Sequence, residues 1–104
     1  MGYGVLRPYV VPATLEELDG PPTGTIELPR HLDWGPERLY HLDQISDVRL
    51  LYTRVIRESA TPDDLRRHLN ATILREVWPD LVLPPRVRTL WLERFPELRV
   101  GPAT

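Results

Sequence analysis

Residues 45–56 read ISDVRLLYTRVI, and their spacing is the clearest indication of structure in the chain. Apolar side chains recur here every three or four residues, which places them on one face of an α-helix. They are Ile45, Val48, Leu51, Tyr52, Val55 and Ile56. Asp43 or Ser46 can cap the start of this helix. The stretch therefore predicts a helix with one buried face.

Further helices are predicted downstream, each with its own start. Residues 61–64, TPDD, combine an N-cap threonine, a proline at the first helical position and two carboxylates near the positive end of the helix dipole. Asn70 can cap the next helix, which Pro79 is expected to end. A last helix is expected to open at residues 84–85 and to end at Pro96. The predicted core consists of the inward-facing residues of these helices: Leu51, Val55, Leu65, Ile73, Val77, Trp78, Val87, Leu90 and Trp91.

Residues 1–42 are too rich in proline and glycine for a long helix. Residues 25–28 alternate and predict a short strand, residues 38–42 its partner, and residues 33–36 the turn between them. The predicted fold is therefore mainly α and a single domain. Three to four short helices lie within about residues 44–97, and the segments are an extended arm (1–42) with a small hairpin (25–42), a helical core (43–99) and a frayed tail (100–104).

Composition excludes several classes of protein. The 104 residues include no cysteine, so disulfides, zinc–thiolate sites and thiol nucleophiles are excluded. The formal net charge of −2 argues against a globally basic nucleic-acid binder. No signal-peptide pattern and no membrane span is expected, which favours a cytoplasmic protein. All 13 basic residues are arginine, as a GC-rich genome would produce.

A repeated tripeptide is the candidate metal site. His31-Leu32-Asp33 and His41-Leu42-Asp43 offer two imidazoles and two carboxylates, which could hold a divalent ion. The simpler interpretation is that they flank the hairpin, with the leucines buried. Neighbouring carboxylates elsewhere, at 16–17 and 63–64, diverge by about 100° on a helix and do not converge on one atom. We therefore expect no catalytic residue, no metal and no cofactor, and predict that the chain is not an enzyme.

A protein-binding surface is the favoured functional interpretation. Tryptophan and tyrosine dominate interface hot spots, and Trp34 beside a Gly-Pro turn is hard to bury. The predicted partner contacts are Tyr3, Tyr9, Val11, Trp34 and Tyr40. The apolar arm must cover the helices of its own chain, cover a second copy or await a partner. A homodimer with residues 3–34 in the interface is the expected form.

Nucleic-acid binding is the alternative. Residues 61–78 predict two short helices joined tightly, similar to a helix-turn-helix. The contacts would then be arginines: Arg66, Arg67, Arg75, Arg86 and Arg88. Acidic residues are interspersed among them, which is typical of a solvated surface and counts against this alternative.

Three short sequence motifs in the C-terminal half resemble those of a known family: Trp78-Pro79, LPPRVR at 83–88 and WLERFP at 91–96. With Leu28-Pro29 and residues 32–35, they resemble a family of short actinobacterial proteins that have no assigned activity. The resemblance implies genes beside nucleotidyltransferase-type toxins, and so an antitoxin or accessory role. The sequence thus favours a non-enzymatic protein-interaction module that can self-associate, with a small DNA-binding regulator or antitoxin as the alternative.

Overall fold

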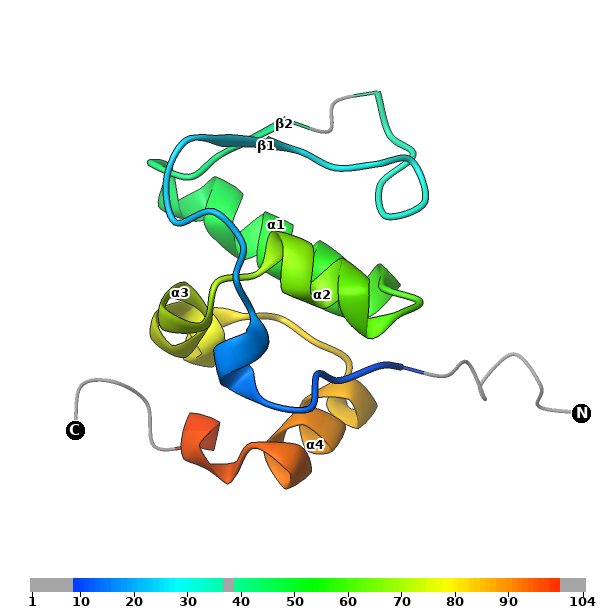
Figure 1. Cartoon of the computed structure of the whole chain (residues 1–104), viewed down its shortest axis with the longest axis vertical. Coiled ribbons are helices and arrows are strands. Elements are labelled where there is room, and N and C mark those ends of the chain that lie inside the picture. The colour runs from blue at the N-terminus through cyan, green and yellow to red at the C-terminus, as the bar shows by residue number, and fades with distance from the viewer. Residues whose placement is uncertain (1–8, 37–38, 100–104) are drawn as a thin grey trace, which may run out of the picture.

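The computed structural model describes residues 9–36 and 39–99, and the fold is mainly α, about 54% helical, as predicted. The elements in chain order are η2 (Leu15–Glu17), β1 (Thr25–Glu27), β2 (Leu39–His41), α1 (Ile45–Glu58), α2 (Pro62–His68), α3 (Ala71–Val77), η3 (Trp78–Asp80), α4 (Pro85–Arg94) and η4 (Pro96–Arg99), where η marks a 3-10 turn. Figure 1 shows the hairpin at one end of the molecule and α4 at the other. No helix among the described residues is both long and apolar enough to cross a membrane. The predicted frayed tail, 100–104, lies outside the described residues.

The predicted hairpin is present and antiparallel, with Thr25 opposite His41 and Ile26 opposite Tyr40. Burial alternates along both strands, so Ile26 and Tyr40 face the core while their neighbours face solvent. The Leu42 N–H donates to the Gly24 carbonyl at 2.8 Å, which closes the open end. The hairpin packs on α1 through β2 and so covers one end of the helical core.

Two of the predicted helix caps are confirmed. The Thr61 hydroxyl accepts the Asp64 N–H at 3.4 Å, and the Asn70 side chain accepts the N–H groups of Thr72 and Ile73. Both caps satisfy donors that a first helical turn leaves without partners. Local sequence was sufficient here because each cap acts within three residues.

The predicted cap of α1 is wrong. The N-cap is Gln44, which makes no side-chain cap bond, so Asp43 lies one residue too early and Ser46 lies inside the helix. The Asp47 carboxylate, in the first turn, instead accepts the His41 N–H at 2.9 Å. A carboxylate at this end is favoured by the helix dipole, and here it also joins β2 to α1.

Pro79 and Pro96 end their α-helices, but the chain continues directly into 3-10 turns. Pro79 lies within η3, and Pro96 opens η4. A proline is tolerated in a first helical turn because the N–H that it lacks would have no intrahelical acceptor there. The prolines therefore change the direction of the chain while keeping it compact.

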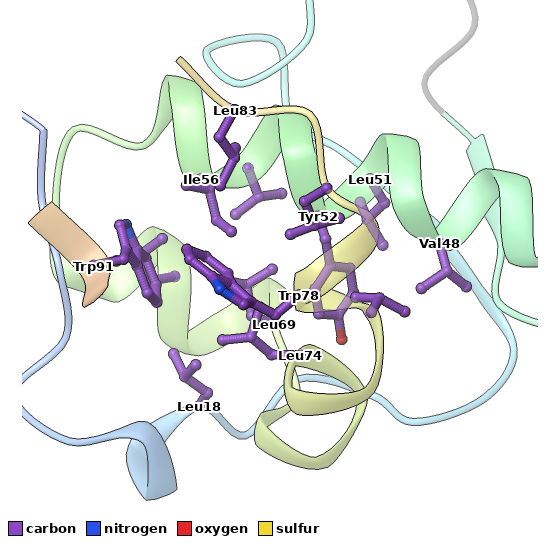
Figure 2. Close-up of a cluster of buried hydrophobic side chains, with 14 of the residues drawn as sticks. Leu18, Val48, Leu51, Tyr52, Ile56, Leu69, Leu74, Trp78, Leu83 and Trp91 are labelled. Atoms are coloured by element: carbon purple, nitrogen blue, oxygen red, sulfur yellow. The ribbon is translucent and has the colours of Figure 1, made fainter. Parts of the chain in front are cut away.

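The core is a single cluster that joins all four α-helices to the N-terminal segment. Trp91 stacks against Trp78 with centroids 6.0 Å apart and against Phe95 at 5.8 Å. Figure 2 shows Trp78 between Ile56 and Leu74, with Trp91 beside it at one side of the drawn cluster. Of the nine predicted core residues seven are buried: Leu51, Val55, Leu65, Val77, Trp78, Val87 and Trp91.

Ile73 and Leu90 are the two exceptions, and both are only partly buried. They lie on α3 and α4, whose fully buried apolar residues are few: Leu74 and Val77 on α3, Val87 and Trp91 on α4. Short helices at the edge of a small domain bury a narrower stripe than periodicity alone predicts.

The N-terminal segment covers the helices of its own chain. Leu15 and Leu18 are buried in the same cluster as the helices, and Val11 packs against it. Gly20 approaches the backbone so closely that a β-carbon there would lie 2.7 Å from the His68 carbonyl carbon. Of the three alternatives for the arm, the described part adopts the first.

Replacing Trp91 by alanine should lower the free energy of unfolding by roughly 3–5 kcal/mol, because the largest buried ring leaves a cavity behind. Chemical denaturation monitored by circular dichroism would measure the change.

Trp34→Ala is the matched control, since the same side chain is 65% exposed there and its removal should change stability by less than about 0.5 kcal/mol. Equal effects of the two substitutions would contradict this account of the core.

Candidate functional site

The loop that joins β1 to β2 presents a tryptophan to solvent. Trp34 is 65% exposed, whereas Leu32 and Asp33 directly before it are buried. Among the described residues it is the largest apolar side chain left in water. A ring of this size in solvent is unusual for a small domain, and the residues around it explain how it is held.

The loop begins with a tight turn. The Pro29 carbonyl accepts the N–H groups of Leu32 and Asp33 at 3.0 and 3.1 Å. Proline fixes its own backbone angle, and the turn then directs the Leu32 side chain into the core. The backbone entering Trp34 is thus fixed by both a turn and a buried side chain.

The buried Asp33 carboxylate, directly before Trp34, binds one group directly after Trp34 and one on β2. One oxygen accepts the Gly35 N–H at 3.0 Å, and the other accepts the Tyr40 hydroxyl at 2.5 Å. Burial, and then the hydrogen bond to Asp33 and its charge, raise the pKa of Tyr40 to about 12, against the opposing effect of Arg54 on α1. Hydrogen bonds to a buried carboxylate are the stronger kind. Asp33 therefore ties the loop to β2, next to α1.

His31 ties the other side of the loop to α2. Its Nε2 lies 2.8 Å from the Asp64 carboxylate, whose second oxygen accepts the Ala60 N–H at 3.1 Å. Burial opposes the ionisation of Asp64, but the hydrogen bonds from His31 and Ala60 outweigh it and lower the pKa of Asp64. This contact joins residues 33 positions apart in the sequence.

The three anchors make a preorganised contact residue. Leu32, Asp33 and His31 each fix the loop to a different part of the core, while Trp34 between them carries no such role. Ordering a flexible loop on binding opposes association, and a loop that is already ordered avoids that cost. Tryptophan is also the side chain most enriched among interface hot spots.

The other predicted protein contacts are placed differently. Tyr9 and Val11 are partly buried against the core, and Tyr3 lies outside the described residues. The prediction for Tyr40 is wrong, because its ring is buried and its hydroxyl binds Asp33. Strand alternation places the neighbouring Leu39 on the solvent face instead, 57% exposed, and this residue was missed.

The five predicted nucleic-acid arginines do not form one basic face. Arg66 binds Glu17 at 3.1 Å, Arg67 binds Asp63 at 2.7 Å and Arg75 binds Glu16 at 2.9 Å. Arg88 donates to the Leu81 carbonyl and lies over the Trp78 ring, 4.9 Å from its centroid, while Arg86 is exposed at the start of α4. Ion pairs with neighbouring carboxylates cancel the local charge that would attract phosphates.

The glutamates of two of these pairs come from η2. The hydrogen bond from Arg66 is the main cause that lowers the pKa of Glu17. The pKa of Glu16 is lowered by a backbone hydrogen bond and then by Arg75. The signs of the charges were visible in the sequence, but their partners lie 49 and 59 residues away.

Three of the four residues of the candidate metal site have separate partners, and the fourth, Asp43, is exposed. His31 binds Asp64, Asp33 binds Tyr40, and His41 Nδ1 lies 3.3 Å from the Thr25 hydroxyl. Within residues 9–36 and 39–99 no three histidine, aspartate or glutamate side chains gather as a metal site would require. The arrangement supports the interpretation of these residues as hairpin and loop anchors.

Tyr40→Phe should lower the free energy of unfolding by roughly 1.5–3 kcal/mol at neutral pH, because a buried carboxylate loses a hydrogen bond. A phenol whose folded pKa is raised stabilises the protein below its unfolded pKa, 10.0, and this contribution disappears as pH rises to about 12. The difference between wild type and variant should therefore shrink over that interval in urea titrations.

Tyr52→Phe is the control, because its buried hydroxyl accepts only the neutral Asn70 N–H, a bond worth about 1 kcal/mol. A larger loss in this variant than in Tyr40→Phe would contradict the importance given to Asp33.

Zinc or manganese should leave the melting temperature almost unchanged, since an ion bound by the native state would raise it by mass action. Differential scanning calorimetry with and without the ion tests this. An upward shift that disappears in His41→Ala would show that the tripeptides bind metal.

Comparison with known proteins identifies no relative of the chain. No protein-family model, no curated protein and no solved structure is significantly similar to the chain. The function is therefore inferred from Trp34 and the residues that hold its loop.

Proposed function

We propose that the chain is a cytoplasmic, non-enzymatic protein-interaction module whose contact surface is centred on Trp34. The observation that carries the proposal is the contrast within three residues. Asp33 is buried and Gly35 is hydrogen-bonded to it, yet Trp34 between them is 65% exposed. Isolated apolar side chains on a surface need no explanation, but an exposed indole whose flanking backbone is held in this way is suited to enter a partner's pocket.

Leu39 is a second exposed apolar side chain on the hairpin. It lies opposite Glu27 where β2 begins, and its side chain is exposed. Interfaces combine an apolar centre with a polar rim, and Trp34 with Leu39 could supply that centre. Arg30 and His31, both exposed on the loop, could supply the rim.

A DNA-binding regulator, the alternative, receives less support. Its proposed contacts Arg66, Arg67 and Arg75 each bind a carboxylate of the same chain. An antitoxin or accessory role that acts through protein binding remains within the favoured proposal. Fluorescence anisotropy with labelled duplex DNA at low salt separates the two, because electrostatic DNA binding is strongest there.

Trp34→Ala should weaken binding to the partner about 30-fold or more, the effect of losing a hot spot of roughly 2 kcal/mol. Affinity capture with the wild-type chain and mass spectrometry would identify the partner. Calorimetry with the purified partner would then measure the affinity of each variant.

Leu50→Ala is the matched control. This side chain is 62% exposed on α1, distant in sequence from the loop, and its removal should leave the affinity unchanged. Equal affinity of wild type and Trp34→Ala would refute the proposed contact surface.

A further inference from the structure

Within the N-terminal region, residues 9–20 lie across three helices and are called the arm from here on. Each of these helices has one arginine that binds the arm. Arg66 of α2 binds Glu17, and Arg75 of α3 binds Glu16. Arg94 of α4 donates to the Ala13 carbonyl at 3.1 Å. Figure 1 shows the arm passing along α4 and turning upward beside α3. The charges of arm and helices are thus complementary.

The arm also meets strict apolar and backbone requirements. Leu15 and Leu18 are buried, and the Gly20 N–H donates to the Leu69 carbonyl at 2.8 Å. The Ala71 N–H donates to the Leu18 carbonyl at 3.2 Å, and a β-carbon at Gly20 would collide with the backbone of His68. Any polypeptide covering this surface must supply two leucines three residues apart, an acidic pair between them and a glycine two residues later.

A short exposed hinge joins the arm to the hairpin. Pro21, Pro22, Thr23 and Gly24 are all exposed, and the chain bends over residues 22–24 before β1 begins. Gly24 has a φ of 97°, the only positive φ among the described residues. Consecutive prolines favour an extended backbone, because each fixes its own φ and restricts the residue before it. Straightening of the bend at residues 22–24 would direct the arm away from the helices of its own chain.

We propose that the arm exchanges between two copies of this chain, so that residues 9–20 of one protomer cover α2, α3 and α4 of the other. A second copy is the occupant that meets every requirement above, since it carries the same LEELDG segment, residues 15–20. All arm contacts are then repeated between chains, and only the hinge changes. Exchange of an identical element is a low-cost route to a two-fold dimer.

The length of the hinge sets the protein concentration at which the dimer is expected to form. A short linker holds its own arm at an effective concentration of the order of 1 mM, which a second copy must match. A preference of the hinge for a straight conformation would lower the protein concentration needed for dimer formation. Exchange is expected to be slow in the native state, because Leu15 and Leu18 must leave the core first. Refolding from urea at about 1 mM therefore gives the arms the opportunity to exchange.

The first experiment is light scattering on the full chain after this refolding. We expect a dimer that persists on dilution, and a protein that is wholly monomeric would overturn the proposal. The Pro21→Ala, Pro22→Ala double variant changes only exposed hinge residues, and its dimer should be roughly tenfold weaker. An unchanged dimer in this variant would overturn the role of the hinge. Trp34→Ala should dimerise as the wild type does, which separates this proposal from the proposed function.

The second experiment identifies the contact. The Asp19 N–H donates to the Arg66 carbonyl at 3.1 Å, so cysteines at these two positions lie within reach of a disulfide, and the chain has no others. Asp19→Cys and Arg66→Cys, made as separate variants and refolded together, should form an interchain disulfide. Asp19→Cys refolded with Arg57→Cys, on the exposed face of α1, is the control and should not. A light-scattering dimer without the specific cross-link would be a surface dimer, and arm exchange would be wrong.

Discussion

Asn70 joins α1, α3 and the N-terminal arm, and its polar atoms are all used. Its backbone N–H donates to the hydroxyl of Tyr52 on α1, and its carbonyl accepts the Leu74 N–H within α3. Its side chain caps α3 with the oxygen and binds the Gly20 carbonyl of the arm with the nitrogen. Apolar burial favours compactness without specifying one arrangement, whereas a satisfied polar network does specify one. The position of the arm between α2 and α3 is set here.

Asp33 has the corresponding role at the other end of the molecule. A buried carboxylate is costly unless its oxygens are bound, and the Tyr40 hydroxyl and the Gly35 N–H bind them. The same two bonds determine the path of the backbone through Trp34. The backbone on both sides of Trp34 is therefore held by the way in which the buried carboxylate is satisfied, while the indole itself is exposed. The Asp33 side chain thus links the packing of the hairpin to the position of the exposed Trp34.

The sequence predicted what depends on near neighbours. Thr61 and Asn70 cap helices within three residues, and the hairpin follows from alternation and turn residues. The exposure of Trp34 was also predicted from the Gly-Pro turn that follows it. Tyr40 was assigned wrongly because its partner, Asp33, lies across the loop, and a phenol can be buried when a carboxylate accepts its hydrogen bond. Local pattern cannot reveal such a pairing.

The same limit explains why the arginines suggested nucleic-acid binding. In the sequence, Arg66 and Arg75 are candidate phosphate contacts with acidic residues interspersed, but in the fold Glu17 and Glu16 reach them from the arm. The arm cannot leave without exposing Leu15 and Leu18 and the surface that they cover, at a cost of roughly 1.5–3 kcal/mol for each leucine. If a second copy replaces the arm, it brings the same glutamates. The two arginines are therefore compensated in the monomer and in an exchanged dimer alike, whereas the exposed Trp34 lies outside the exchanged segment.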